Sequence, residues 1–429
     1  MGAFWSVVTD GMVVRPDQVS VGVLAGVVDR DRVDEAVAVC GVRAYRSGGK
    51  LPPHVVAYLT MALCLFSDDS SEEVAAKVTG ALTAWGCWDA AWGAPTASGI
   101  TQARKRLGPK VLERVFNSVA APVATAATRG AWLRDWRLVA IDGFEVDVPD
   151  TTANGDEFGY RSNGEHRSAF PKARVVALSE CGTHAFLAAE VAGVTTGEHA
   201  MAERLFGRLL GEEMLCADRG FYSFNGWTHA KATGAQLLWR APTTLRLPVI
   251  RVLADGTYLS VLIDSSVRGR RREAILAAAG AGDELDPQTA HLVRVIEYDI
   301  ADRGSDELIV LLSTVCDPAT ASAGELAAAY HQRWEHETAN DQLKTHLRGP
   351  GKVLRSRSPE LVYQEIWAWL TTHYAITTVM ARAAEAADLD PDRLSFTRAL
   401  NIIRRTATGT AAFPPSPLEG PGNPRPHPR

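Results

Sequence analysis

The chain has 429 residues, of which 46% are hydrophobic and 22% charged, enough for roughly two to four domains with sizeable cores. Its net charge of −5 excludes a histone-like protein coated with positive charge. A DNA-binding protein is not excluded, because phosphate contacts depend on local clusters of cations. No run of eighteen apolar residues and no secretory leader is evident, so we expect a cytoplasmic protein without a membrane partner. The six cysteines lack zinc-type spacing, and buried reduced thiols are favoured.

Residues 1–130 are expected to form an all-α N-terminal domain, because apolar residues recur there at helical spacing. Thr96 is a predicted N-cap for a helix that ends in the basic cluster Arg104, Lys105 and Arg106. One interpretation is a helix-turn-helix-like DNA reader in which these three side chains are possible DNA contacts. The alternative is an amphipathic helix with an ordinary solvated basic face.

Residues 131–241 alternate between apolar strand-like runs and helical patterns, which is typical of an α/β core. The predicted strands include residues 138–141, 144–148, 174–178, 185–189, 213–217 and 236–240, and the predicted helices are 198–210 and 224–233. Residues 242–314 differ, because short strands with turns between them predict a β-rich insertion there. Its predicted strands are 249–253, 258–263, 293–300 and 308–312.

Residues 315–405 are predicted to complete the core with two long helices, at 324–347 and 359–387. Ser358 and Pro359 form a cap and first turn for the second helix. Residues 406–429 are rich in proline and glycine and are expected to form a disordered tail.

Three carboxylates are candidates for chemistry. Asp142 and Asp218 each follow an apolar run that is expected to be a buried strand, and Glu337 lies on the first long helix. Each aspartate alone could simply begin a turn, because glycine follows closely in both cases. Together, the three oxygen ligands suit a pair of Mg²⁺ ions that act on a phosphodiester. Glu145 and Asp147 are discounted because they point to the opposite pleat face if the strand continues.

Four residues of the first long helix share one stripe. At 100° per residue, Arg333, Glu337 and Lys344 fall within about 60° of Tyr330. The two cations could hold non-reacting phosphates and Tyr330 could donate a hydrogen bond to one. A weak ion pair on a solvated helix is the alternative.

This spacing resembles the Y-x-x-R-x-x-x-E-x-x-x-x-x-x-K signature of D-D-E class insertion-sequence transposases, the insertion element 4 group. The Asp-Gly pair at 142–143 and the Ala-Asp-Arg-Gly-Phe-Tyr run at 217–222 resemble the two aspartate motifs of that group, and the resemblance extends from about residue 10 to residue 405. It implies an RNase H-like mixed-sheet core with a β-strand insertion between the second aspartate and the glutamate.

The resemblance also implies a function. Such a transposase binds the terminal inverted repeats of its element as a homodimer, cleaves double-stranded DNA with two Mg²⁺ ions, and joins the 3′-hydroxyl ends to target DNA. Mn²⁺ is an expected substitute for Mg²⁺. Asp142, Asp218 and Glu337 would bind the metal ions, while Tyr330, Arg333 and Lys344 would grip terminal phosphates. The group also carries a base-stacking aromatic in its insertion, which we cannot place here; Trp239 is expected to pack in the core instead.

Two rival functions remain open. A nuclease of the same fold would hydrolyse DNA without strand transfer, and the sequence does not separate it from a transposase. A catalytically inactive DNA-binding regulator derived from a transposase is less compatible with three retained carboxylates.

Overall fold

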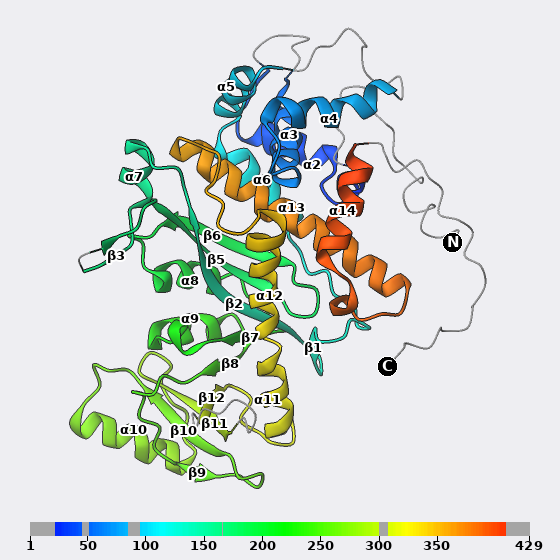
Figure 1. Cartoon of the computed structure of the whole chain (residues 1–429). Coiled ribbons are helices and arrows are strands. Elements are labelled where there is room, and N and C mark those ends of the chain that lie inside the picture. The colour runs from blue at the N-terminus through cyan, green and yellow to red at the C-terminus, as the bar shows by residue number, and fades with distance from the viewer. Residues whose placement is uncertain (1–21, 45–50, 85–94, 165, 300–307, 409–429) are drawn as a thin grey trace, which may run out of the picture.

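A computed structural model describes residues 22–44, 51–84, 95–164, 166–299 and 308–408. Helices from the N-terminal part gather at one end, a mixed sheet with helices on both faces forms the middle, and the insertion lies at the other end (Figure 1). No helix among these residues is long and apolar enough to cross a membrane. None of the five cysteines described is in a disulfide, in line with the expectation of reduced thiols.

The helical character expected for the N-terminal part is confirmed for its described residues. The elements are η1 (Gly22–Gly26), α2 (Arg30–Val39), α3 (Pro53–Leu65), α4 (Ser71–Ala84), α5 (Ala97–Leu107) and α6 (Pro109–Val119). Thr96 is the N-cap of α5, because its hydroxyl oxygen accepts a hydrogen bond from the Gly99 amide at 3.2 Å.

The basic cluster at the end of α5 does not have a uniform environment. Arg104 is only 5% exposed, and its guanidinium donates to Gln364 Oε1 at 2.8 Å and to Ser356 Oγ at 3.2 Å. Gln364 in turn donates to the Arg104 and Gly108 carbonyls at the C-terminal end of α5. The prediction of Arg104 as a DNA contact is therefore corrected, since it is a buried link to the C-terminal helices. Lys105 and Arg106 are exposed.

The α/β core is built on one mixed sheet, which has ten strands among the described residues. Its order is β6-β5-β2-β7-β8-β12-β11-β10-β9, with β1 beside β2. The pairs β6-β5 and β5-β2 are antiparallel, whereas β2-β7 and β7-β8 are parallel. The core strands are β1 (Trp132–Leu133), β2 (Trp136–Asp147), β5 (Lys172–Glu180), β6 (Phe186–Gly193), β7 (Glu213–Ala217) and β8 (Gln236–Arg240). A short helix and a two-stranded ribbon follow β2: α7 (Thr152–Phe158), β3 (Ser162–Asn163) and β4 (His166–Arg167).

Alternation along β2 decides which helices each side chain meets. Val139 and Ile141 pack with α8 (Glu198–Phe206) and α9 (Phe224–Ala232) on one face. Leu138 and Ala140 pack with α11 (Ala323–His331) on the other face. Because successive side chains point to opposite faces, Asp142 projects toward the α11 side.

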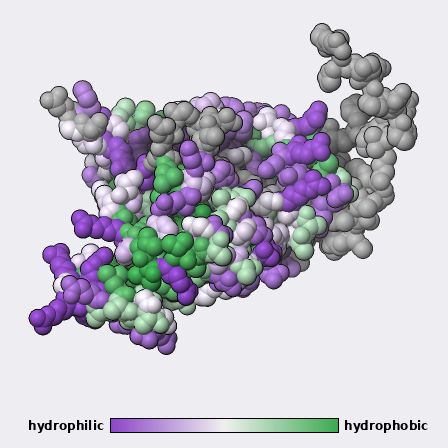
Figure 2. Space-filling model, turned by 90° about the horizontal axis from the view of Figure 1, so that it is seen from below, coloured by the Kyte–Doolittle hydropathy of each residue, from purple (hydrophilic) through white to green (hydrophobic). Residues whose placement is uncertain are grey.

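The predicted insertion extends the same sheet, because β12 pairs with β8 along Leu312 and Trp239. Its strands are β9 (Arg251–Val252), β10 (Tyr258–Ile263), β11 (Ala290–Tyr298) and β12 (Ile309–Ser313). A helix that the strand pattern does not predict, α10 (Gly269–Ala281), lies between β10 and β11. Alanine favours this helix, and its Ile275, Leu276 and Ala279 pack against the strands of the insertion. The apolar residues 274–279 are consecutive, however, so no helical period in the sequence reveals the helix. Seen from the insertion end, an apolar area is framed by hydrophilic side chains (Figure 2).

The C-terminal helices depart from the prediction in two ways. The expected continuous helix over 324–347 is interrupted: α11 ends at His331, α12 covers Trp334–Asp341, and a π-helix, η3, covers Gln342–Leu347. The amides of Gln332 and Arg333 bond to carbonyls three residues back, which tightens the chain between α11 and α12. After α13 (Pro359–Ala386) and η4 (Pro391–Arg393), an unexpected helix, α14 (Phe396–Ala407), includes the start of the predicted tail. Residues 409–429 of that tail lie outside the described residues.

Helix α13 joins the N-terminal helices to the sheet in the middle of the molecule. It matches the prediction closely and is buried on nearly all sides, where it packs against α3, α6 and β6. The N-terminal helices and the mixed sheet consequently share one hydrophobic core, which contains Phe116, Trp367 and Phe144.

We predict that Arg104→Ala lowers the free energy of unfolding by about 2–4 kcal/mol, because it leaves buried hydrogen-bond partners on α13 unsatisfied. Thermal or urea unfolding measures this change. Lys105→Ala removes the same charge from an exposed neighbour and is the control, expected to stay within about 0.5 kcal/mol of the unmodified chain. Equal stabilities for the two variants would contradict the assignment of Arg104 to the core.

Candidate active site

Parallel pairing of β2 and β7 brings two aspartates together. The register aligns Ile141 with Ala217, so Asp142 and Asp218 are the next residues on neighbouring strands. The expectation that Asp142 ends its strand is wrong, because β2 continues through Gly143 to Asp147 along its antiparallel partner β5. Asp142 instead lies inside β2, one residue beyond Ile141, the last residue of β2 that pairs with β7.

The turn interpretation of Asp218 does not account for its carboxylate. Asp218 is at the N-cap of the short helix η2 (Arg219–Phe221), but its side chain makes no capping hydrogen bond. Its Oδ1 is buried, and no described residue donates a hydrogen bond to it. The Arg240 guanidinium is 3.9 Å from the same oxygen. A buried carboxylate oxygen without a donor is a position where a cation can be bound.

Asp142 faces α12. Its Oδ1 accepts a hydrogen bond from the Gly143 amide at 2.8 Å, and its Oδ2 accepts one from Asn340 Nδ2 at 3.3 Å. Burial raises the pKa of the Asp142 carboxyl to about 6, opposed by the Gly143 hydrogen bond and the charge of Arg333 and reinforced by Glu198 and Glu337. Burial therefore disfavours the ionised form of Asp142, and a nearby positive charge would favour it.

Arg333 lies among the candidate carboxylates. It is 7% exposed, and its Nη2 is 3.7 Å from Glu337 Oε1. Burial opposes its charge, but nearby Tyr330, Asp218, Glu337 and Asp142 raise the pKa of the guanidinium. Arg333 therefore stays charged and compensates part of the negative charge at the site.

Tyr330 and Lys344 complete the predicted stripe in different ways. Tyr330 is 3% exposed, its ring is 5.6 Å from the Arg333 guanidinium, and no described residue hydrogen-bonds to its hydroxyl. Burial raises its pKa, so the hydroxyl remains a donor. Lys344 is half-buried, with Nζ 5.7 Å from the ring of Phe144 on the Asp142 face of β2. Because the helix is interrupted, a uniform 100° step does not describe this stripe.

The discounted acids do lie elsewhere. Glu145 pairs with Arg161 and with Arg174 at 3.0 Å, and Asp147 pairs with Lys172 at 2.7 Å. Both are on the pleat face opposite Asp142, as the continuous strand requires.

The fit of a metal ion differs among the three carboxylates. In the part of the chain that the structure describes, no three His, Cys, Asp or Glu side chains are close enough to hold one ion. Asp142 and Asp218 nevertheless suit a hard divalent cation, because they are adjacent oxygen ligands. Burial raises the pKa of the Asp142 carboxyl, and the buried Oδ1 of Asp218 accepts no hydrogen bond from a described residue. Glu337 is exposed and lies against Arg333.

Comparisons with known proteins identify the family. Residues 18–117 match the insertion element 4 transposase N-terminal family, and residues 135–374, more than half of the chain, match the transposase DDE domain. The chain belongs to the DDE transposases of the insertion element 4 family. Metal-dependent chemistry is general to this domain class, and the mixed sheet with its β insertion agrees with the expected fold.

Two relatives of this transposase family member occur in Escherichia coli strain K12. The InsG transposase of insertion sequence element IS4 is 28% identical over 314 residues, covering 72% of this chain and 66% of InsG. The match thus spans just under two thirds of that relative. The InsZ protein is 30% identical over 152 residues, covering 34% of this chain and 49% of InsZ. Among solved structures, the piggyBac transposase in a synaptic complex with hairpin DNA has a TM-score of 0.47 at 9% identity, covering 90% of this chain and 80% of that one.

Three neighbours of the candidate site were not predicted from the sequence. Asn340 lies three residues after Glu337, a helical spacing that could have indicated it. Glu198 packs on the far side of the sheet, where a Cβ at Gly143 would collide with its carboxylate, and Arg240 approaches Asp218 from the end of β8. Neither has a local sequence signal. Trp239 is fully buried against Phe206 and Trp227, so its assignment to the core is confirmed.

We predict that Asp142→Asn stabilises the metal-free protein at pH 7.5 by about 2–3 kcal/mol. The pKa of Asp142 is about 6 in the folded protein and lower in the unfolded chain. The free energy of unfolding is therefore lowered by the buried anion well above pH 6, and this loss disappears below about pH 4. The gain should therefore disappear at about pH 4. Urea unfolding in EDTA at both pH values measures it, and a variant no more stable than the parent at pH 7.5 would show that Asp142 is not held in a destabilising environment.

Proposed function

We propose that this family member is a transposase that binds the terminal inverted repeats of its element, cleaves DNA there with two divalent metal ions, and joins the 3′-hydroxyl ends to target DNA. The observation that carries the proposal is the juxtaposition of Asp142 and Asp218 on parallel strands of a DDE domain, facing the helix that carries Glu337.

In this proposal Asp142, Asp218 and Glu337 hold the metal ions, and their oxygen ligands favour Mg²⁺, with Mn²⁺ as a substitute. When bound, the ions supply an activated water and stabilise the leaving oxygen. Arg333 offers planar donors to a phosphate, and Tyr330 offers a protonated hydroxyl. Lys344 adds a point charge beside Phe144.

The partner is double-stranded DNA, at the element's ends and at the target, and we propose a homodimer in the DNA complex. We assign DNA binding to residues 1–130, where Lys105 and Arg106 are exposed. We assign catalysis to residues 131–241 and 315–405, with 242–314 as the insertion between them.

We predict that Glu337→Gln, Asp142→Asn and Asp218→Asn each reduce cleavage of labelled element-end DNA in Mg²⁺ by more than the roughly 10–100-fold typical of outer-shell partners. Asp341→Asn removes the same charge from an exposed position on α12 and should retain cleavage. Replacing Mg²⁺ with Ca²⁺ tests binding without turnover.

The outcomes separate the rival functions. Joined products together with cleavage support a transposase, whereas cleavage without joining under any condition favours a nuclease. Binding without cleavage in any divalent metal favours a regulator. Unchanged cleavage by Glu337→Gln would remove Glu337 from the chemistry.

A further inference from the structure

Helix α14 presents a basic face that no part of the proposed mechanism uses. It covers Phe396–Ala407 and lies outside both segments that match the family. Ser395 caps it, because its hydroxyl oxygen accepts a hydrogen bond from the Arg398 amide at 3.3 Å. The helix buries a regular apolar face made of Phe396, Leu400, Ile403 and Ala407.

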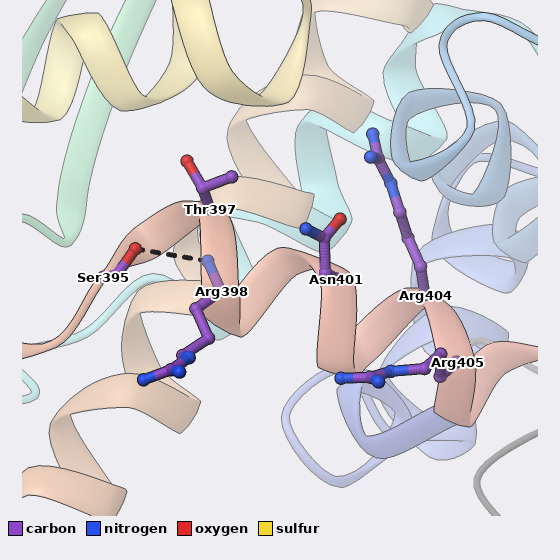
Figure 3. Close-up of a pocket in the computed structure, with 6 residues that line it drawn as sticks. All are labelled: Ser395, Thr397, Arg398, Asn401, Arg404 and Arg405. Atoms are coloured by element: carbon purple, nitrogen blue, oxygen red, sulfur yellow. Dashed lines mark hydrogen bonds between the residues drawn. The ribbon is translucent and has the colours of Figure 1, made fainter.

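The opposite face of α14 is polar and exposed. Arg398, Asn401, Ile402 and Arg405 fall within about 100° of arc around the helix axis. Arg398 and Arg405 extend to the same side of the helix (Figure 3). Ile402 is 47% exposed, an unusual position for a large apolar side chain between arginines.

A hollow of about 640 Å³ lies against this helix. It is lined by Ser395, Thr397, Arg398, Asn401, Arg404 and Arg405, which include three arginines and no carboxylate. Among the described residues, no acidic side chain forms an ion pair with Arg398. The lining is therefore complementary to a polyanion.

Helix α14 is fixed in place by contacts on its inner side. Arg404 Nε donates to the Leu65 carbonyl of α3 at 2.6 Å, and Thr397 Oγ1 is 3.2 Å from His346 Nδ1 of η3. A second hollow shares Ser395 and Thr397 with the first and reaches Thr338 of α12, the neighbour of Glu337. This second hollow is also lined by Asp341 and Asp392, so the carboxylate-free lining belongs to the first hollow alone.

We propose that α14 is a DNA-contacting helix that lies along a groove of the duplex, with Arg398, Asn401 and Arg405 toward the DNA. Arginine can bind guanine or phosphate bidentately, and asparagine can do the same with adenine. Ile402 supplies an apolar contact such as that with a thymine methyl group. The inference rests on the proposed function, because it takes the duplex to be the substrate.

We predict weaker DNA binding by Arg398→Ala, Asn401→Ala and Arg405→Ala in the full-length chain. Fluorescence anisotropy with an element-end duplex and a random-sequence duplex of equal length, over about 50–200 mM salt, measures it. If the arginine reads bases, its variant should bind roughly 5- to 100-fold more weakly. If it contacts phosphate, the slope of log K against log salt concentration should become less negative by about 0.9 for each phosphate that is no longer neutralised. Asn401→Ala should weaken binding to the end duplex more than to the random one.

Lys231→Ala removes one exposed positive charge from α9, which packs on the sheet face opposite Asp142, and is the control. Unfolding temperatures should be unchanged, because the three α14 residues are exposed. If the parent chain still binds and cleaves, affinities and salt slopes equal to those of Lys231→Ala would overturn the inference. A parent chain that binds neither duplex would instead overturn the proposed function.

Discussion

The parallel pairing of β2 with β7 is the constraint on which the site depends. It places Asp142 of β2 beside Asp218, the residue that follows β7, and the pleat directs Asp142 toward α12. The two flanking helices on the other face, α8 and α9, hold this pairing through a core that contains Trp227 and Trp239. A shift of one residue in the register would turn Asp142 to the opposite face, away from Glu337.

The same arrangement has an electrostatic cost. Burial disfavours the Asp142 anion and leaves Asp218 Oδ1 without a donor, and Arg333 compensates only part of this charge. The tightened turn between α11 and α12 lies at Arg333, and the π-helix follows where Gln342 contacts His184 and His373. These departures from a regular helix occur where the signature residues are needed, which is common at functional sites.

Strong local patterns made much of the fold predictable. The runs 213–217, 236–240 and 258–263 coincide with β7, β8 and β10, because short apolar runs with clear turns mark buried strands. The prediction that Asp142 ends its strand is wrong because Gly143 resembles a turn residue in the sequence. In the structure, pairing with β5 keeps β2 extended through Gly143. The burial of Arg104 and the positions of Glu198 and Arg240 depend on partners far away in sequence, so no local pattern could indicate them.

If Asp142, Asp218 and Glu337 act as one metal site, a crystal of the protein with element-end DNA should show metal ions bound to all three. Soaking with Mn²⁺ and recording anomalous scattering places the ions without relying on activity. We expect manganese between Asp142 and Asp218, with Glu337 turned away from Arg333 to bind it at about 2.0–2.2 Å. Manganese bound elsewhere, or at the aspartates while Glu337 stays against Arg333, would contradict it.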